Sequence, residues 1–174
     1  AEVFTEPVYR GISVTKIIQK LDLATGKPVG GMATHLLRGD HVRVTVLVAT
    51  PDDVRNVMLY DPLPGALEAI DDNLFHIPGQ SDGAQAYTFG HYWWWSFAGF
   101  TNKQVHANGV QFFAQWLWAG THQVTYDAIV VTRGRFVVPP AKCWALQQPE
   151  LMGLSAGGSL ATTTTPLPTD VAAA

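Results

Sequence analysis

The stretch His41-Val42-Arg43-Val44-Thr45-Val46-Leu47-Val48 places a valine at every second position. Because successive side chains of an extended chain point to opposite sides, all of these valines share one face. β-branched residues at this spacing are typical of a strand that is buried on one side. The sequence therefore predicts a core strand over residues 41–49 and an all-β protein.

Two pairs of alternating runs are joined by short turns. Residues 41–49 are followed, after Pro51-Asp52-Asp53, by a run over residues 56–61. Residues 110–118 alternate in the same way and are followed by a run over residues 124–130. Connections this short are typical of β-hairpins, so we expect the two runs of each pair to lie side by side.

Three other segments carry weaker patterns. Residues 8–21 predict a strand with a bulge at Ile17-Ile18, where the alternation changes phase. Residues 86–97 are apolar on both faces, which predicts a strand covered on both sides. Residues 141–152 are the best candidate for a turn or two of helix. The whole pattern predicts an antiparallel β-sandwich of roughly seven to nine strands. The residues expected in its core are Val42, Val44, Val46, Val48, Leu59, Phe112, Trp116, Val124 and Tyr126.

The composition of the 174-residue chain restricts its class. This length fits one domain with a sizeable core. Charged residues make up 14% of the sequence, against about 25% in an average soluble domain, so we expect another molecule to cover part of the surface. The net charge of −3 supplies no basic stripe for phosphates, which argues against a nucleic-acid partner. No window approaches the ~20 apolar residues of a membrane span.

The composition changes after residue 154. Residues 1–154 contain the alternating runs, whereas residues 155–174 are mostly Gly, Ser, Thr, Ala and Pro. Such a composition is typical of a linker or tail. The β-propensity of its threonines predicts a last edge strand over residues 159–165, and we expect residues 166–174 to dock on a neighbouring molecule.

Two motifs in distant parts of the chain match one known family. They are Asp61-Pro62-Leu63-Pro64-Gly65-Ala66-Leu67-Glu68 and Arg133-Gly134-Arg135-Phe136-Val137-Val138-Pro139-Pro140-Ala141. The first resembles the D-x-L-P-A-G-x-E turn of the carboxy-terminal macroglobulin-like β-sandwich in bacterial-type alpha-macroglobulins. The second resembles the T-P-G-x-F-x-V-P-P-A segment later in the same domain. Leu37-Arg38-Gly39-Asp40 and Pro149-Glu150-Leu151 resemble two further elements of that family.

This resemblance extends over residues 8–165 and implies a macroglobulin-like sandwich from an extracellular, cell-surface or periplasmic protein that traps proteases. It implies a role in binding and assembly, with other domains or protein subunits as partners. Two departures stand out: Pro64-Gly65-Ala66 replaces the usual Pro-Ala-Gly, and residues 80–100 have no counterpart. The structural residues that the resemblance implies are Asp61, Leu63, Pro64, Glu68, Gly134, Phe136, Pro139 and Pro140.

Residue types that carry catalysis or bind metals are present without the spacing that such sites need. The six histidines are isolated from one another, and no catalytic signature surrounds the single cysteine, Cys143. The C-x-E-Q thioester motif that full-length alpha-macroglobulins often carry is absent from this sequence. We therefore expect no catalytic residue, no cofactor, no metal site and no enzymatic activity.

Trp93-Trp94-Trp95 marks the candidate interaction surface. A strand cannot point three adjacent tryptophans into one core, so we expect Trp94 outside, with Tyr92 on the same face. In one interpretation these two residues form a platform for a sugar or a protein. In the other, Trp93 and Trp95 are core residues and only Trp94 lies outside. Three functions remain open: a binding module of an alpha-macroglobulin, a structural subunit of a cell-surface or extracellular assembly, and a carbohydrate-binding sandwich.

Overall fold

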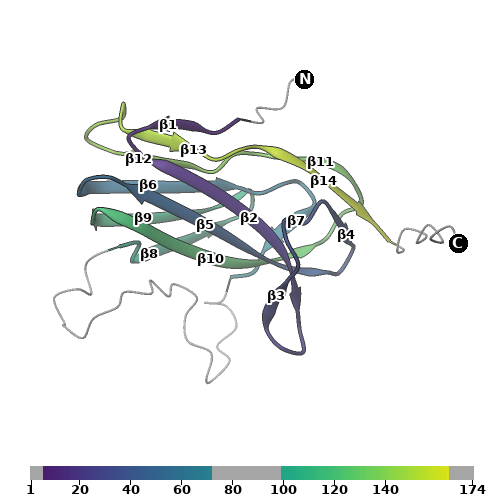
Figure 1. The fold of residues 1–174 in the computed structure, drawn as a ribbon. Helices are drawn as coiled ribbons and strands as arrows, with labels where there is room; N and C mark the ends of the chain where they lie inside the picture. Colours follow the sequence, from purple (N-terminus) through teal and green to yellow (C-terminus); the bar gives the residue numbers. More distant parts are fainter. Residues whose placement is uncertain (1–5, 72–98, 165–174) are drawn as a thin grey trace, which may run out of the picture.

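The computed structural model describes residues 6–71 and 99–164, and these residues form an all-β sandwich (Figure 1). The expected fold class is confirmed, with more strands than expected because five of them have only three residues and leave no periodic pattern in the sequence. The strands are β1 (Val8–Arg10), β2 (Ser13–Asp22), β3 (Lys27–Val29), β4 (His35–Leu37), β5 (His41–Thr50), β6 (Val54–Pro62), β7 (Leu67–Ala69), β8 (Asn102–His106), β9 (Gly109–Leu117), β10 (Gly120–Val130), β11 (Gly134–Val138), β12 (Lys142–Ala145), β13 (Met152–Leu154) and β14 (Gly158–Thr163).

Two large sheets form the layers of the sandwich. The six-stranded sheet has the order β1-β13-β12-β6-β9-β8, and the five-stranded sheet has the order β3-β2-β5-β10-β7. A three-stranded sheet, β11-β14-β4, lies at one end of the long strands (Figure 1). Strand β14 runs parallel to β4, whereas the strand pairs within the two large sheets are antiparallel.

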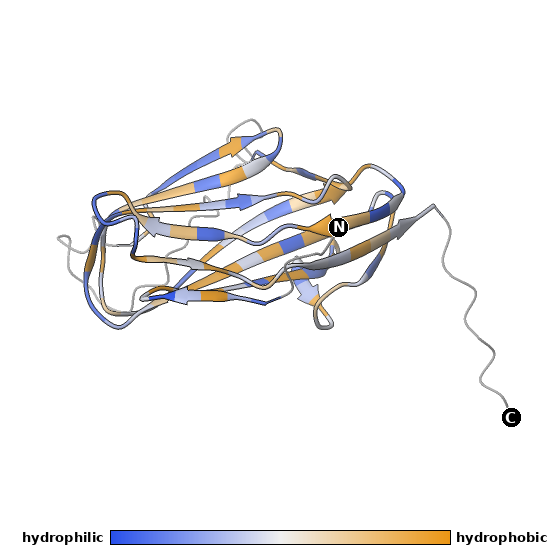
Figure 2. Cartoon of the chain, turned by 90° about the horizontal axis from the view of Figure 1, so that it is seen from above, coloured by the Kyte–Doolittle hydropathy of each residue, from blue (hydrophilic) through white to orange (hydrophobic). Residues whose placement is uncertain are grey.

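The core lies between the two large sheets. Strand β5 pairs with β2 on one side and β10 on the other, and its four valines are at most 1% exposed, which confirms the predicted core strand. Figure 2 shows hydrophobic and hydrophilic bands alternating along the strands, as a half-buried sheet requires. The rings of Phe112 (β9) and Tyr126 (β10) lie 6.4 Å apart, so the inner faces of the two sheets meet at this point.

Both predicted hairpins are wrong. Strands β5 and β6 belong to different sheets, and so do β9 and β10, so each short connection crosses from one layer to the other. Alternation shows which side chains point inward but does not show which sheet a strand joins, and a crossing connection can be as short as a hairpin turn. The two crossings are neighbours, because Asp53 Oδ1 accepts a hydrogen bond from the amide of Ala119 at 2.9 Å.

Two local predictions are also corrected. Strand β2 pairs with β5 without interruption from Ser13 to Lys20, so Ile17-Ile18 is not a bulge. The chain breaks earlier, at Gly11, whose positive φ of 80° separates β1 from β2. Residues 141–152 contain β12 and the start of β13 rather than helix, since alternate residues there face the core. The expected strand over residues 86–97 lies outside the described residues.

The sandwich continues beyond the composition change at residue 154. Ser155 and Leu160 are each 1% exposed, and β14 lies between β11 and β4. Strand β14 is thus an interior strand of its sheet rather than an edge strand. Composition alone did not show this because Leu160 and Thr162 are the alternate residues that face inward, and only one of them is apolar.

The single cysteine, Cys143 on β12, is fully buried in the core. Burial raises the pKa of its thiol from 9.0 to about 12. The unfolded chain releases this proton near its ordinary pKa, whereas the folded chain retains it, so the folded state binds more protons between these two values. The free energy of unfolding therefore falls as the pH rises through this window.

Replacing Cys143 with alanine should remove this part of the pH dependence. Between pH 9 and pH 11, the free energy of unfolding of Cys143→Ala should fall by about 2 kcal/mol less than that of the wild type. Urea unfolding at several pH values, followed by tryptophan fluorescence, measures both slopes. Equal slopes would show that the thiol ionises alike in the folded and unfolded chains.

Candidate functional site

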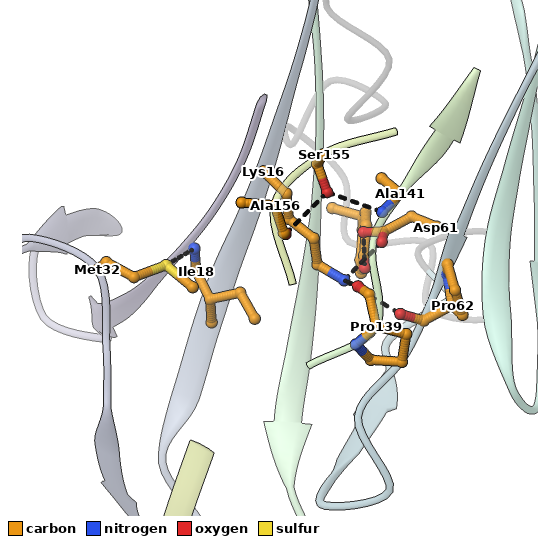
Figure 3. Close-up of polar contacts among 10 residues, drawn as sticks. Lys16, Ile18, Met32, Asp61, Pro62, Pro139, Ala141, Ser155 and Ala156 are labelled. Atoms are coloured by element: carbon orange, nitrogen blue, oxygen red, sulfur yellow. Dashed lines mark hydrogen bonds and ion pairs between the residues drawn. The ribbon is translucent and has the colours of Figure 1, made fainter. Parts of the chain in front are cut away.

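Lys16 joins the two sequence motifs inside the sandwich. Its ammonium group lies 2.5 Å from Oδ1 of Asp61, in the first motif, and donates to the backbone oxygen of Pro62 at 3.0 Å. It also donates to the backbone oxygen of Pro139, in the second motif, at 3.3 Å. Figure 3 shows these three acceptors converging on the lysine. Together with Tyr126, these residues form what we call the motif junction.

Tyr126 completes the motif junction from β10. Its hydroxyl donates to the second carboxylate oxygen of Asp61 at 2.6 Å. Lys16 and Tyr126 belong to the five-stranded sheet and Asp61 to the six-stranded sheet, so these contacts connect the two layers. The side chains of Lys16 and Asp61 are only 1% and 0% exposed, which seals the junction from solvent.

Burial and charge act together on the ionisation of the junction. Burial raises the pKa of Asp61, and the charge of Lys16 and the two hydrogen bonds oppose that rise. Burial raises the pKa of Tyr126 well above 10.0, and the adjacent Asp61 carboxylate raises it further, so this hydroxyl stays a donor at neutral pH. A buried ion pair is costly to break, because removing one partner leaves an uncompensated charge in the core.

The first motif forms the turn that follows β6. The amide of Leu67 donates to the backbone oxygen of Pro64 at 2.9 Å and closes the turn. Neither Gly65 nor Ala66 has a positive φ. Glycine is favoured at position 65 for a different reason: a Cβ there would lie 3.3 Å from the ring of Phe136 in the second motif. The order Pro64-Gly65-Ala66 therefore suits the contact between the two motifs.

The remaining motif residues differ in how closely they take part in this contact. Gly134, with a φ of 148°, brings the backbone so close to Phe136 that a Cβ would lie 3.1 Å from its ring. Leu63 is buried, and Pro139-Pro140 is half-buried. Glu68 is exposed on β7 and is not among the residues that meet Lys16.

Lys16 is the residue that sequence reasoning missed. Val14, Lys16 and Ile18 alternate into the core, so the lysine occupies an inward position. A lysine in such a position requires a buried carboxylate partner. The signal is the alternation of β2, which places Lys16 on the same inward face as Ile18, and Asp61 of the first motif is the carboxylate that meets it.

Arg38-Gly39-Asp40 forms a turn between β4 and β5. Oδ2 of Asp40 accepts a hydrogen bond from the amide of Leu37 at 2.8 Å, and Oδ1 lies 2.9 Å from the ammonium group of Lys20. Gly39 has a φ of 91°, which favours glycine. The carboxylate of Asp40 is thus engaged inside the protein, in keeping with a structural role for the turn.

A change of phase in β6 and β9 turns Trp116 out of the core. Val54 and Val57 are both buried although they are three positions apart, and Asn56 between them has a positive φ of 52°. Trp116 pairs with Arg55 in the register, and both face away from the core. Trp116 is half-buried on the outer side, so the prediction that places it in the core is wrong, because simple alternation cannot anticipate this slip.

This slip creates what we call the tryptophan surface: Arg55, Asn56, Gln115, Trp116 and Trp118. The first four residues line a pocket of about 370 Å³. The guanidinium of Arg55 lies 4.4 Å from the centre of the Trp116 ring, which stacks on the ring of Trp118 at 5.5 Å. Trp118 is 41% exposed, and Nε1 of Trp116 is buried without a hydrogen-bond partner among the described residues. The tryptophan surface thus offers aromatic faces, a guanidinium and amides to a ligand.

The candidate interaction residues Tyr92 and Trp94 lie outside the described residues, so their role stays a prediction. Within residues 6–71 and 99–164, no group of three or more His, Cys, Asp and Glu residues is placed to hold a metal ion. A search of the same residues for a helix long and apolar enough to cross a membrane found none.

The Lys16–Asp61 pair should contribute strongly to stability. Lys16→Met leaves the Asp61 carboxylate buried without a counter-charge and should lower the free energy of unfolding by about 3–5 kcal/mol. The double variant Lys16→Met/Asp61→Asn should regain part of this loss, since it removes the unpaired charge. Urea unfolding of the wild type, both single variants and the double variant measures the coupling.

Lys20→Met is the matched control for this experiment. It breaks the ion pair with Asp40, but the Lys20 side chain is 50% exposed, so the expected loss is about 1 kcal/mol or less. Equal losses for Lys16→Met and Lys20→Met would contradict the view that the motif junction holds the sheets together.

Comparison with known proteins identifies relatives of the chain. A family model described as the bacterial alpha-2-macroglobulin MG10 domain matches residues 11–150. A search of curated proteins found no match. A crystal structure of Salmonella alpha-2-macroglobulin reacted with methylamine has a TM-score of 0.68 and 19% identity over 91% of this chain and 10% of that chain. A crystal structure of trypsin-activated alpha-2-macroglobulin from Escherichia coli has a TM-score of 0.69 and 19% identity over 90% of this chain and 11% of that chain.

A third structure is native alpha-2-macroglobulin from Escherichia coli, from domain MG7 to the C-terminus, with a TM-score of 0.69 and 18% identity over 90% of this chain and 24% of that chain. The chain therefore spans between a tenth and a quarter of the length of these three structures. At these identities the structural likeness shows the shared sandwich fold. The family is shown by the sequence model, whose match extends from β2 to the loop after β12 and includes both motifs. The chain belongs to the bacterial alpha-2-macroglobulin MG10 domain family.

Proposed function

We propose that the chain is a noncatalytic binding and assembly module of a larger, protease-trapping protein of the alpha-macroglobulin type. The family places it as a domain of a macroglobulin-type protein, and the much greater length of the matched structures supports neighbouring domains as its partners. In this proposal the protein acts outside the cytoplasm, in the periplasm, at the cell surface or in the extracellular space. Its role is to hold a fixed surface against the other domains.

The burial of the chemically active side chains carries this proposal. Counted over whole residues, backbone included, Lys16, Asp61 and Cys143 are 9%, 0% and 0% exposed, and Tyr126 is 3% exposed. A nucleophile or a proton donor acts only where a substrate can reach it, and these groups lie between the sheets. The groups that line the pocket of the tryptophan surface are an indole ring, a guanidinium and amides, which serve binding rather than bond cleavage.

Deletion of this domain tests the assembly role in the complete protein that contains it. Without residues 1–174, the protein should lose its capacity to inhibit trypsin acting on a protein substrate, and its native mass or shape should change. Cys143→Ala is the matched control: it removes the only thiol of the domain and should leave inhibition within about twofold of the wild type, because the buried thiol does no chemistry. Full inhibition after the deletion, or loss of inhibition by a folded Cys143→Ala protein, would contradict the proposal.

The tryptophan surface favours carbohydrate binding as a second candidate function. Stacked tryptophans beside a pocket with amide and guanidinium donors are suited to sugar rings, whose apolar faces stack and whose hydroxyls need partners. The buried Nε1 of Trp116 is a donor that a sugar hydroxyl would satisfy.

A fluorescence titration of the chain with a panel of oligosaccharides tests this second function. Trp118→Ala should weaken binding about tenfold or more, since a stacking aromatic contributes on the order of 1–2 kcal/mol. Leu146→Ala is the control, because Leu146 is an exposed apolar residue, 47% accessible, that does not line the pocket. If the wild type binds no oligosaccharide at millimolar concentration, the tryptophan surface has another use.

A further inference from the structure

The two large sheets differ in the outer faces that they present. On the five-stranded sheet, Thr45 pairs with Thr125, and the next row is Gln19, Arg43 and Asp127, in which Arg43 forms an ion pair with Asp127 at 2.8 Å. These polar side chains suit contact with water. Apolar residues such as Ile17 are scattered among them, which is normal for a solvated sheet.

The outer face of the six-stranded sheet is apolar instead. Met152, Trp144, Met58 and Phe113 are direct neighbours across β13, β12, β6 and β9, and so form one continuous row. The adjacent row contains Leu154 and Tyr60. All of these residues are half-buried, although they point away from the core. We call these six residues the apolar outer face.

The exposed charges on the strands of the six-stranded sheet have one sign, although the connections between them carry carboxylates such as Glu150. Arg10, Lys142 and Arg55 are exposed on the outward side of the six-stranded sheet, and the only carboxylate on its six strands is Asp61, which is buried in the motif junction. None of the three cations forms an ion pair with a carboxylate of the described residues.

Two of these cations are held in place by tryptophans. The ammonium group of Lys142 lies 5.0 Å from the ring centre of Trp144, as the guanidinium of Arg55 does at 4.4 Å from that of Trp116. Cations positioned over rings in this way remain available to a carboxylate at the edge of the face. These two cations therefore complement carboxylates on the surface of a partner.

We propose that the apolar outer face docks a neighbouring protein domain whose contact surface has an apolar centre and carboxylates at its rim. This inference rests on the proposed assembly function and specifies the surface that serves it. Methionine and tryptophan are enriched in protein interfaces, where they adapt to and anchor a partner. The matched structures are four to ten times longer than the aligned part of this chain, so neighbouring domains are at hand in proteins of this family.

Thiol labelling of the complete protein tests which face is covered. Gln111→Cys places a thiol on the outer side of the six-stranded sheet, beside Tyr60, and Thr45→Cys is its matched control on the outer side of the five-stranded sheet. The native Cys143 is buried and reacts slowly, so it does not obscure the result. In the isolated chain both engineered thiols should react with a maleimide. In the complete protein, Gln111→Cys should react at least about tenfold more slowly while Thr45→Cys stays reactive, as read by peptide mass spectrometry.

Charge reversal tests the chemistry of the partner. Lys142→Glu should restore labelling of Gln111→Cys in the complete protein by about tenfold, because a carboxylate facing the partner's acidic rim is repelled. Lys27→Glu is the control, since Lys27 is an exposed lysine of the five-stranded sheet and should leave the labelling unchanged. If Lys142→Glu has no effect on the labelling, the partner does not place carboxylates against this lysine.

The other outcomes separate this inference from the proposed function. If Gln111→Cys reacts freely in a complete protein that depends on this domain, the docking face is wrong while the assembly role stands. If the complete protein does not depend on the domain, the assembly role is itself wrong. Protection of Gln111→Cys in the isolated chain would overturn the inference. If the thiol then becomes reactive on dilution, a second copy of the chain covers the face. If it stays protected on dilution, the chain covers the face itself.

Discussion

The buried ion pair between Lys16 and Asp61 is the interaction on which the arrangement of this sandwich depends. Each group would be very costly to bury alone, so neither strand can hold its position without the other. The pair also fixes relative position, because the lysine must reach the backbone oxygens of Pro62 and Pro139 at the same time. Hydrophobic contacts between two sheets tolerate sliding, whereas this set of acceptors does not. The junction therefore explains why two motifs far apart in the sequence belong together.

The two layers have different relations to their surroundings. The outer face of the five-stranded sheet is suited to water, as in an ordinary half-exposed sheet. The outer face of the six-stranded sheet combines apolar rows with cations that form no ion pair within residues 6–71 and 99–164. The low proportion of charged residues in the chain, 14%, is consistent with a surface of which one side is reserved for contact. Fold and family thus agree on a domain of a larger macroglobulin-type protein.

Much of the inside of the molecule was predictable from the sequence, and much of its connectivity was not. Eight of the nine residues expected in the core are buried. The exception is Trp116, because the positive φ of Asn56 shifts the phase of the alternation next to it. The hairpins failed because a strand alternates in the same way whichever sheet it joins. Lys16 has no motif around it, and only its inward position in the alternation of β2 distinguishes it from a surface lysine. The roles of Tyr92 and Trp94 stay predictions.

The crossing connections also determine when the sheets can form as the chain is made. Strand β5 can pair with β2 at once, but β6 finds its partners only in β9 and β12, which are synthesised much later. Until residue 109 has emerged, β6 has two unpaired edges and a row of apolar side chains without cover. Pairings between such distant segments are slow to form and are exposed to aggregation in the meantime. For this architecture, the same short turns that make the folded sandwich compact leave the nascent chain dependent on its second half.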